Sequence, residues 1–204
     1  MSFNTHSHYP LNRNYVKRIQ DTLNKSINEY SRTLVLRVDL RLPEFDTDSY
    51  NSDSSLITRF IVSLKAQIEA DLLKRQNTGK RMHPCRLRHI WAREFSRTGK
   101  KHYHVVLLLN REAHPYPGNY RSVNGEHSHN LALMIMKAWV RTLGLNQQYY
   151  PLVEFPANCY YHLSKNSAAF ATEYEAVTTR INYLAKEYSK DYSDGQRSFG
   201  CSQY

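Results

Sequence analysis

Residues 94–110 have the sequence EFSRTGKKHYHVVLLLN, in which a polar segment containing a glycine separates two stretches that favour β-structure. The polar segment 96–101 predicts a short turn, so residues 85–95 and 102–110 are expected to form a β-hairpin. Positions 105–109 are all apolar, which is typical of a strand that is buried on both faces. The second strand of the hairpin is therefore expected to be a central strand of a sheet.

His102 and His104 lie two positions apart on this strand, so their side chains are expected to project from the same face. Two imidazoles side by side can hold one divalent metal ion. The same His-x-His spacing occurs at residues 6–8, in a terminal segment, and at 127–129, at the start of a predicted helix. Only the copy at 102–104 lies on a predicted strand, so only this copy predicts a metal site.

The turn decides whether an acidic side chain joins this pair. A three-residue loop in which Gly99 takes the left-handed conformation would pair Ser96 with Lys100. Glu94 would then lie opposite His102 and on the same face of the hairpin. A two-residue turn would instead direct Glu94 to the other face. We predict the three-residue loop, and with it a site of one carboxylate and two imidazoles, which suits Mg²⁺ or Mn²⁺.

A tyrosine and a lysine near the C-terminus are the second candidate for chemistry. Tyr183 and Lys186 are three residues apart on a predicted helix and are therefore expected to share a face. A phenol has a pKa of about 10 and becomes a useful nucleophile only when a nearby cation or metal favours the phenolate. Lys186 could do this, or bind negative charge on a phosphate. The neighbours Ile181 and Leu184 equally suit a tyrosine that merely packs on an amphipathic helix.

The rest of the chain predicts further helices and strands. Strict alternation at 32–42 predicts a strand with apolar residues on one face and Arg37, Asp39 and Arg41 on the other, buried on one side only. Residues 43–55 and 111–128 are expected to be loops. The remaining expected elements are helices over residues 11–30, 56–76, 129–143 and 167–188 and a short strand over 149–155.

This order of elements predicts an α+β fold, in which helices lie mainly on one face of a central antiparallel sheet and the other face is open for a substrate. The length of 204 residues suits one domain. We expect that domain to span residues 1–190, followed by a polar tail, 191–204, whose composition is compatible with disorder.

A net charge of +10 makes nucleic acid the first partner to expect. The three cysteines form no CxxC pair, which favours a reducing cytoplasm over a disulfide framework or a thiolate zinc site. No apolar run has the length of a membrane helix, and the N-terminal segment lacks the apolar core of a secretory signal. We therefore expect a cytoplasmic protein without a membrane partner.

Glu94, seven intervening residues, His102-Tyr103-His104, an aliphatic run and a later Tyr183-Leu-Ala-Lys186 together resemble the motifs of the HUH endonucleases. The motifs cover about two dozen positions. Over its length and element order the chain is most similar to the short replication-initiator-like proteins of filamentous phages (inoviruses) and related prophages. The resemblance implies a Rep/relaxase-like sheet that carries the HUH motif.

The resemblance also implies an activity. His102, His104 and a third ligand would hold Mg²⁺ or Mn²⁺, which polarises a scissile phosphate in single-stranded DNA, and Tyr183 would attack it. The products would be a 5′-phosphotyrosine link and a free 3′-hydroxyl, and the link would later be reversed by rejoining. Lys186 matches the lysine of the family's YxxK motif. The implied role is initiation of rolling-circle replication at the origin of a phage, prophage or mobile element, with host replication proteins as further partners.

Four basic residues are candidates for contacts to that DNA: Arg37, Arg41, Lys100 and Lys101. Two features depart from the family pattern. The first strand, with LVLRVD at 34–39, lacks the usual central Thr or Ser, and Tyr188 and Tyr192 offer a second possible tyrosine arrangement. A catalytically inactive, prophage-encoded DNA-binding regulator on the same scaffold is the main alternative. An RNA-binding domain that stacks bases on exposed aromatic residues is a third reading.

Overall fold

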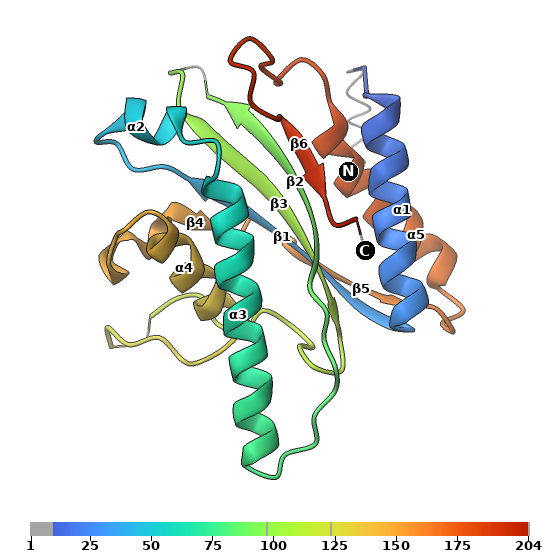
Figure 1. Ribbon diagram of the computed structural model, residues 1–204. Helices are drawn as coiled ribbons and strands as arrows, with labels where there is room; N and C mark the ends of the chain where they lie inside the picture. Colours follow the sequence, from blue (N-terminus) through green and yellow to red (C-terminus); the bar gives the residue numbers. More distant parts are fainter. Residues whose placement is uncertain (1–9, 97, 123, 204) are drawn as a thin grey trace.

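The computed structural model describes residues 10–96, 98–122 and 124–203, which form a six-stranded antiparallel sheet with helices on both faces (Figure 1). The strands are β1 (Arg32–Arg41), β2 (Arg88–Phe95), β3 (Lys101–Asn110), β4 (Val153–Glu154), β5 (Tyr160–Ser164) and β6 (Phe199–Cys201). The helices are α1 (Arg13–Glu29), α2 (Thr47–Ser52), α3 (Leu56–Asn77), α4 (Leu131–Thr142) and α5 (Phe170–Asn182), with 3₁₀ turns η1 (Gln147–Leu152) and η2 (Tyr183–Ala185). The α+β class is as predicted.

The strand order is β4-β1-β3-β2-β6, and the predicted hairpin is the β2–β3 pair at its centre. Every residue from Val105 to Leu109 is fully buried, as the continuous apolar run predicted. One edge of β1 pairs with β3, while β4 and β5 pair with different parts of the other edge, at residues 39–40 and 32–36. β3 is therefore the rigid central strand from which His102 and His104 project.

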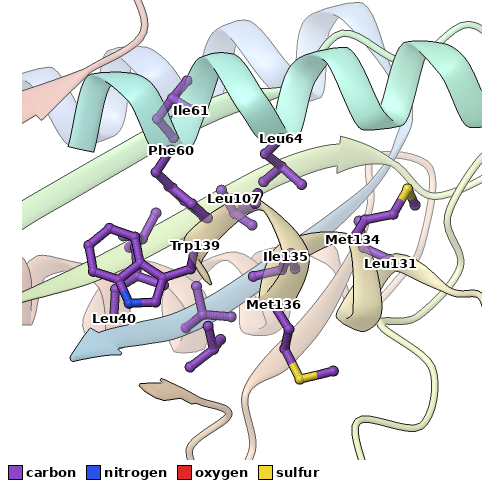
Figure 2. Close-up of a cluster of buried hydrophobic side chains, with 14 of the residues drawn as sticks. Leu40, Phe60, Ile61, Leu64, Leu107, Leu131, Met134, Ile135, Met136 and Trp139 are labelled. Carbon is purple, nitrogen blue, oxygen red and sulfur yellow. The ribbon is translucent and has the colours of Figure 1, made fainter. Parts of the chain in front are cut away.

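Helices α3 and α4 cover one face of the sheet. Figure 2 shows Phe60 and Leu64 of α3 and Trp139 of α4 packed over Leu107 of β3. The rings of Phe60 and Trp139 meet edge to face, with centroids 5.8 Å apart. The indole Nε1 of Trp139 donates a hydrogen bond to the Arg41 carbonyl oxygen at 2.7 Å, so the buried polar atom is satisfied and α4 is tied to β1.

Helices α1 and α5 cover the opposite face, so the expectation of helices mainly on one face was wrong. Leu23 of α1 and Ile181 of α5 belong to a second apolar cluster that includes Val35, Val106 and Leu108 of the sheet. An apolar run such as 105–109 sends alternate side chains to both faces, and each face then needs a cover. For the same reason β1 is buried on both sides, not on one. The polar side chains of this face, among them Glu94, His102 and His104, lie toward one end of β2 and β3.

The polar C-terminal segment is part of the domain, not a disordered tail. β6 pairs with β2, and the buried ring of Phe199 stacks on Tyr15 of α1 at a centroid distance of 4.2 Å. The buried guanidinium of Arg93 bonds the carboxylate of Asp194 and the carbonyl oxygens of Asp191 and Gln196. A buried charge needs such acceptors, and the segment supplies them.

Smaller differences concern single elements. Most of the predicted strand 149–155 is the 3₁₀ turn η1, which contains Pro151, a residue without a backbone donor for a sheet. α2 lies inside the predicted loop 43–55, and β5 was not predicted. The last predicted helix, 167–188, ends at Asn182. Among the helices of the described residues, none combines the length and apolar character that a membrane span requires.

Candidate active site

The β2–β3 turn has the predicted register. The backbone N–H of Ser96 donates to the Lys100 carbonyl oxygen at 2.9 Å, and Gly99 has a φ of 74°. Glu94 consequently lies directly opposite His102. Arg97, the first residue of the predicted loop, lies outside the described residues. The glycine therefore sets the register that brings the acid to the histidine pair.

Glu94, His102 and His104 form a compact group of metal-ligand atoms. Each offers one atom, and these three atoms lie within 4.8 Å of one another. Glu94 is only 3% exposed, and the two imidazole rings meet edge to face with centroids 5.0 Å apart. A carboxylate oxygen and two imidazole nitrogens fit a divalent ion such as Mn²⁺ or Mg²⁺. The three predicted ligands are thus brought together at the surface end of β3.

Asp39 of β1 orients one of the two histidines. Asp39 and His104 are opposed residues, and the His104 Nδ1 atom lies 2.7 Å from the Asp39 Oδ1 atom. A hydrogen on Nδ1 that is donated to this carboxylate leaves Nε2 as the ligand atom, and Nε2 lies 3.4 Å from Glu94 Oε2. The Arg37 guanidinium bonds both oxygens of Asp39. The arrangement matches the carboxylate–imidazole pairs that support metal ligands.

These contacts move the pKa values of both partners. Burial raises the pKa of Asp39, but the hydrogen bond and charge of His104 and the charge of Arg37 outweigh it, so the net pKa is lowered. Burial lowers the pKa of His104, but Asp39 and Glu94 outweigh it and the net pKa is raised. Burial, followed by the charge of His104, lowers the pKa of His102. Asp39 was not predicted as a site residue, although its position on the polar face of β1 was the available signal.

Two lysines hold Glu94 from its other side. Lys186 Nζ lies 3.1 Å from Glu94 Oε2, and Lys190 Nζ lies 2.8 Å from Glu94 Oε1. The Lys190 side chain is 0% exposed. Burial raises the pKa of Glu94, but hydrogen bonds from His104 and Lys190 lower it well below its ordinary value. Lys190 was not predicted, because it stands in a polar segment without a recognisable element.

The cluster carries more positive than negative charge. Two carboxylates, Asp39 and Glu94, face three cationic side chains, Arg37, Lys186 and Lys190. All five lie in or beside the group of predicted metal ligands. Such a surplus of positive charge suits an anionic ligand, and a phosphate group would find ammonium and guanidinium donors here.

Tyr183 lies at the rim of this cluster, in η2 and not on the preceding helix. Its ring centroid is 6.4 Å from that of His104 and 3.7 Å from Lys186 Nζ. The side chain is 38% exposed, so a substrate can reach it. Burial raises the pKa of Tyr183, but the hydrogen bond and charge of Lys186 outweigh it and the net pKa falls below the ordinary value. Tyr183 and Lys186 thus meet, but they do so at a 3₁₀ turn and not on one face of the predicted α-helix.

The other candidate tyrosines differ from one another. Tyr188 shares Lys186 with Tyr183, since Lys186 Nζ donates to the Tyr188 hydroxyl at 3.4 Å. Burial and the hydrogen bond with Tyr183 raise the pKa of Tyr188. Tyr192 instead donates to Glu187 Oε2 at 3.1 Å, and its hydroxyl lies near that of Tyr15. Tyr188 and Tyr192 therefore contact different partners, and the tyrosine with the lowered pKa is Tyr183.

Of the predicted DNA-binding residues, Lys101 faces away from the cluster. It is 1% exposed, and its Nζ donates to the carbonyl oxygens of Asn51 and Asp53 at 2.8 Å each. Strand alternation places Lys101 on the same face as Tyr103, where its ammonium caps the C-terminal end of α2. The prediction of a DNA contact at Lys101 was wrong, because the side chain is already used inside the fold.

The other three basic residues lie on or near the face of the cluster. Arg37 is buried against Asp39, and exposed Arg41 forms an ion pair with Glu154 of β4. Lys100 lies in the hairpin turn, where its Nζ is 2.5 Å from Glu44 Oε1. Arg41 is opposed to His102 across β1 and β3, so it flanks the predicted metal ligands directly.

Comparison with known proteins places the whole chain in one family. Residues 2–202 match the family model described as YagK/YfjJ C-terminal domain. The uncharacterized protein YagK of Escherichia coli (strain K12) is 39% identical over 196 residues, which cover 93% of this chain and 92% of YagK. The uncharacterized protein YfjJ of the same organism is 33% identical over 201 residues, 93% of each chain. No solved structure matches the chain. With nearly its full length matched, the chain belongs to the YagK/YfjJ C-terminal domain family.

Proposed function

We propose that the protein is a metal-dependent endonuclease that nicks and rejoins single-stranded DNA in the cytoplasm, with Tyr183 as its nucleophile. One observation carries this proposal: two groups of residues that are 79 or more positions apart in sequence lie together in one polar cluster. The first group is Glu94, His102 and His104, and the second is the pair Tyr183 and Lys186. Lys186 joins the two groups, since it contacts both Glu94 and the ring of Tyr183. Structural packing alone does not require a buried acid, two imidazoles and a lysine beside an exposed tyrosine.

Glu94, His102 and His104 would hold Mg²⁺ or Mn²⁺, which when bound supplies a positive charge that polarises a phosphate oxygen. Asp39 keeps the Nε2 atom of His104 directed at this position. Arg37, behind Asp39, adds a positive charge beside the same face. These residues would bind and orient one phosphodiester of the DNA.

Tyr183 would then carry out the transfer. Lys186 stabilises the developing phenolate, and the Tyr183 hydroxyl oxygen attacks phosphorus. A new oxygen–phosphorus bond forms to tyrosine as the bond between phosphorus and the 3′-oxygen breaks. The proton lost by the phenol is balanced by the proton gained on the leaving 3′-hydroxyl. One phosphodiester replaces another, so the reverse attack by the 3′-hydroxyl rejoins the strand.

The resemblance of these motifs to the HUH endonucleases supports a more specific role. We propose that the substrate is a single-stranded origin of a phage, prophage or mobile element, and that nicking starts rolling-circle replication with host replication proteins. The chain's net charge of +10 agrees with a nucleic-acid substrate. Exposed Arg41, beside His102, is the basic residue best placed to contact the DNA backbone near the cluster.

A covalent-adduct assay tests the proposal without knowledge of the origin. The purified protein is incubated with Mn²⁺ and a random pool of labelled single-stranded oligonucleotides, and label that stays on the protein in denaturing gels is measured. The wild type and Tyr188→Phe are expected to form the adduct. Tyr183→Phe and the double variant His102→Ala/His104→Ala are expected to form none. An adduct that persists in Tyr183→Phe would overturn the assignment of Tyr183 as the nucleophile.

One observation favours the alternative, a non-catalytic DNA-binding regulator. Both oxygens of Glu94 already have an ammonium partner, Lys186 on one and Lys190 on the other, so the acid is neutralised without a metal ion. Calorimetry separates the two functions. Binding of Mn²⁺ that is lost in His102→Ala/His104→Ala supports the enzyme. No Mn²⁺ binding, together with strong and salt-dependent binding of DNA, supports the regulator.

A further inference from the structure

A second cleft lies next to the candidate active site, at the β4 edge of the sheet. It has a volume of about 720 Å³ and is lined by residues of β4, η1 and α4 and, from the long loop that precedes α4, by residues 120–122 and His127. In Figure 1, β4 and α4 lie together at this edge of the sheet. Ligand-binding pockets commonly have volumes of roughly 300 to 1,000 Å³, so the space is large enough for a nucleotide.

The β-sheet register connects this cleft to the metal-ligand cluster. Arg41, which lines the cleft, is opposed to His102, and Glu154, which also lines it, is opposed to Asp39. The Arg41–Glu154 ion pair therefore stands between the cleft and the histidines. Neighbouring strands are about 4.8 Å apart, so β3 and β4 lie roughly 10 Å from one another on the two sides of β1. A DNA strand at the cluster can thus continue into the cleft.

The lining has the chemistry that unpaired bases require. Tyr120 and Phe155 are stacked, with centroids 4.7 Å apart and an interplanar angle of 15°, and the Tyr120 ring is exposed. An exposed aromatic ring of this kind is a surface on which a base can stack. Two exposed side-chain amides, Gln147 and Gln148, supply both donors and acceptors for the edge of a base, and exposed Arg121 supplies positive charge.

We propose that this cleft binds the base of an unpaired nucleotide adjacent to the scissile phosphate, stacked on Tyr120. The proposal rests on the proposed function for its substrate, single-stranded DNA, and adds a subsite to it. Stacking positions the neighbouring phosphate over the cluster, while the amides of Gln147 and Gln148 select among bases. The cleft accordingly determines which sequence is cut, and the cluster performs the cutting.

Equilibrium binding of fluorescent single-stranded oligonucleotides, measured by anisotropy in EDTA so that no cleavage occurs, tests the subsite. Tyr120→Ala is expected to weaken binding by about 5- to 150-fold, the loss that corresponds to one base–aromatic stack. Phe155→Leu keeps an apolar side chain for packing and is expected to weaken binding less. The matched control is Tyr116→Ala, an exposed tyrosine of the same loop that does not line the cleft. Its affinity should equal that of the wild type.

An abasic scan locates the contact. Oligonucleotides with a single abasic site at successive positions should bind the wild type more weakly at one or two positions only. In Tyr120→Ala the same oligonucleotides should all bind alike, because the stacking partner is gone. Wild-type affinity in Tyr120→Ala would overturn the subsite.

The two proposals fail separately. Adduct formation with Mn²⁺ together with unchanged affinity in Tyr120→Ala removes the subsite and leaves the nuclease. Affinity that depends on Tyr120, in a protein that never forms an adduct, removes the nuclease and leaves a cleft that binds single-stranded DNA. Equal losses in Tyr120→Ala and Tyr116→Ala would show that the loop contributes only general contacts, and this result also overturns the subsite.

Discussion

His104 and Asp39 are opposed residues of β3 and β1, and their hydrogen bond of 2.7 Å directs the Nε2 atom of His104 toward Glu94. The pair joins the strand that carries the histidines to the strand that carries Arg37 and Arg41. Because Asp39 touches the histidine on the side away from Glu94, it would orient His104 as a ligand of the proposed metal ion without occupying the ligand position.

The Asp39–His104 contact predicts an effect on metal affinity. Asp39→Asn keeps the shape of the side chain but removes the charge that fixes the hydrogen on Nδ1. Outer partners of this kind typically change metal affinity by about 10- to 100-fold, and we expect Asp39→Asn to weaken Mn²⁺ binding within this range in calorimetry. Glu154→Gln, which removes a carboxylate of the same face without touching His104, is the control. Equal losses in both variants would mean that total charge, not orientation, is responsible.

Lys190 is expected to affect Mn²⁺ affinity in the opposite direction from Asp39. Its buried ammonium lies 2.8 Å from Glu94 Oε1 and would therefore compete with the proposed metal ion for the same carboxylate. Lys190→Met is expected to strengthen Mn²⁺ binding several-fold and, in EDTA, to lower the free energy of unfolding by about 1 to 3 kcal/mol, because buried Glu94 loses one partner. The exposed Lys17→Met should change neither quantity. Weaker Mn²⁺ binding in Lys190→Met would show instead that Lys190 holds Glu94 in place for the ion.

The sequence was sufficient where the interactions are local. Gly99 sets the loop length, the loop sets the register, and the register places Glu94 opposite His102, all within nine residues. The apolar run of β3 likewise identified the central strand. These features depend on turn geometry and strand alternation, which adjacent residues determine.

The residues that contact Glu94 and His104, Lys190 and Asp39, could not be predicted from local sequence. Asp39 meets His104 through the β1–β3 register, which no short turn fixes, because α2, α3 and β2 lie between the two strands in sequence. Lys190 reaches Glu94 from the segment that follows α5, in which the buried Arg93 bonds the carbonyl oxygens of Asp191 and Gln196. Polar composition indicated disorder for that segment, whereas a buried charge on another strand determines its structure.

The hairpin turn gives a prediction that separates stability from register. At Gly99, with φ of 74°, a Cβ would meet no atom within 4 Å, so Gly99→Ala adds backbone strain without a clash. We expect a loss of about 1 kcal/mol in the free energy of unfolding and unchanged Mn²⁺ affinity. Gly79→Ala, at a similar φ of 72° beyond the end of α3, should cost about the same. Urea denaturation and calorimetry measure the two quantities.

Deletion of Thr98 is the complementary change, because it shortens the loop to two residues. The register then shifts so that Glu94 points to the opposite face, and Mn²⁺ binding should be lost. The other side chains of β2 change face as well, so the free energy of unfolding should also fall. Retained Mn²⁺ binding in the deletion variant would show that His102 and His104 alone suffice, and that Glu94 is not a ligand.

Two histidines whose pKa values are lowered predict that the free energy of unfolding falls in mild acid. His114 is 2% exposed, its Nε2 atom has no hydrogen-bond partner among the described residues, and burial, followed by the charge of Arg75, lowers its pKa to about 4. Burial likewise lowers the pKa of His89 to about 4. The unfolded chain takes up these protons near the ordinary pKa of about 6.5, whereas the folded protein does not. Stability is therefore fully present above this value and is lost as the pH falls from about 6.5 toward 4.

His114 alone should lower the free energy of unfolding at pH 5 by about 2 kcal/mol. Urea denaturation at about pH 7.5 and at about pH 5 measures this difference. His114→Gln should reduce this pH dependence without abolishing it, because His89 still contributes. His83→Gln, which also removes one imidazole but lies in the segment between α3 and β2, should leave the wild-type dependence in place. If the free energy of unfolding falls as much in acid for His114→Gln as for the wild type, another group causes the loss of stability. The imidazole of His114 must then already be protonated or exposed to solvent in the folded protein.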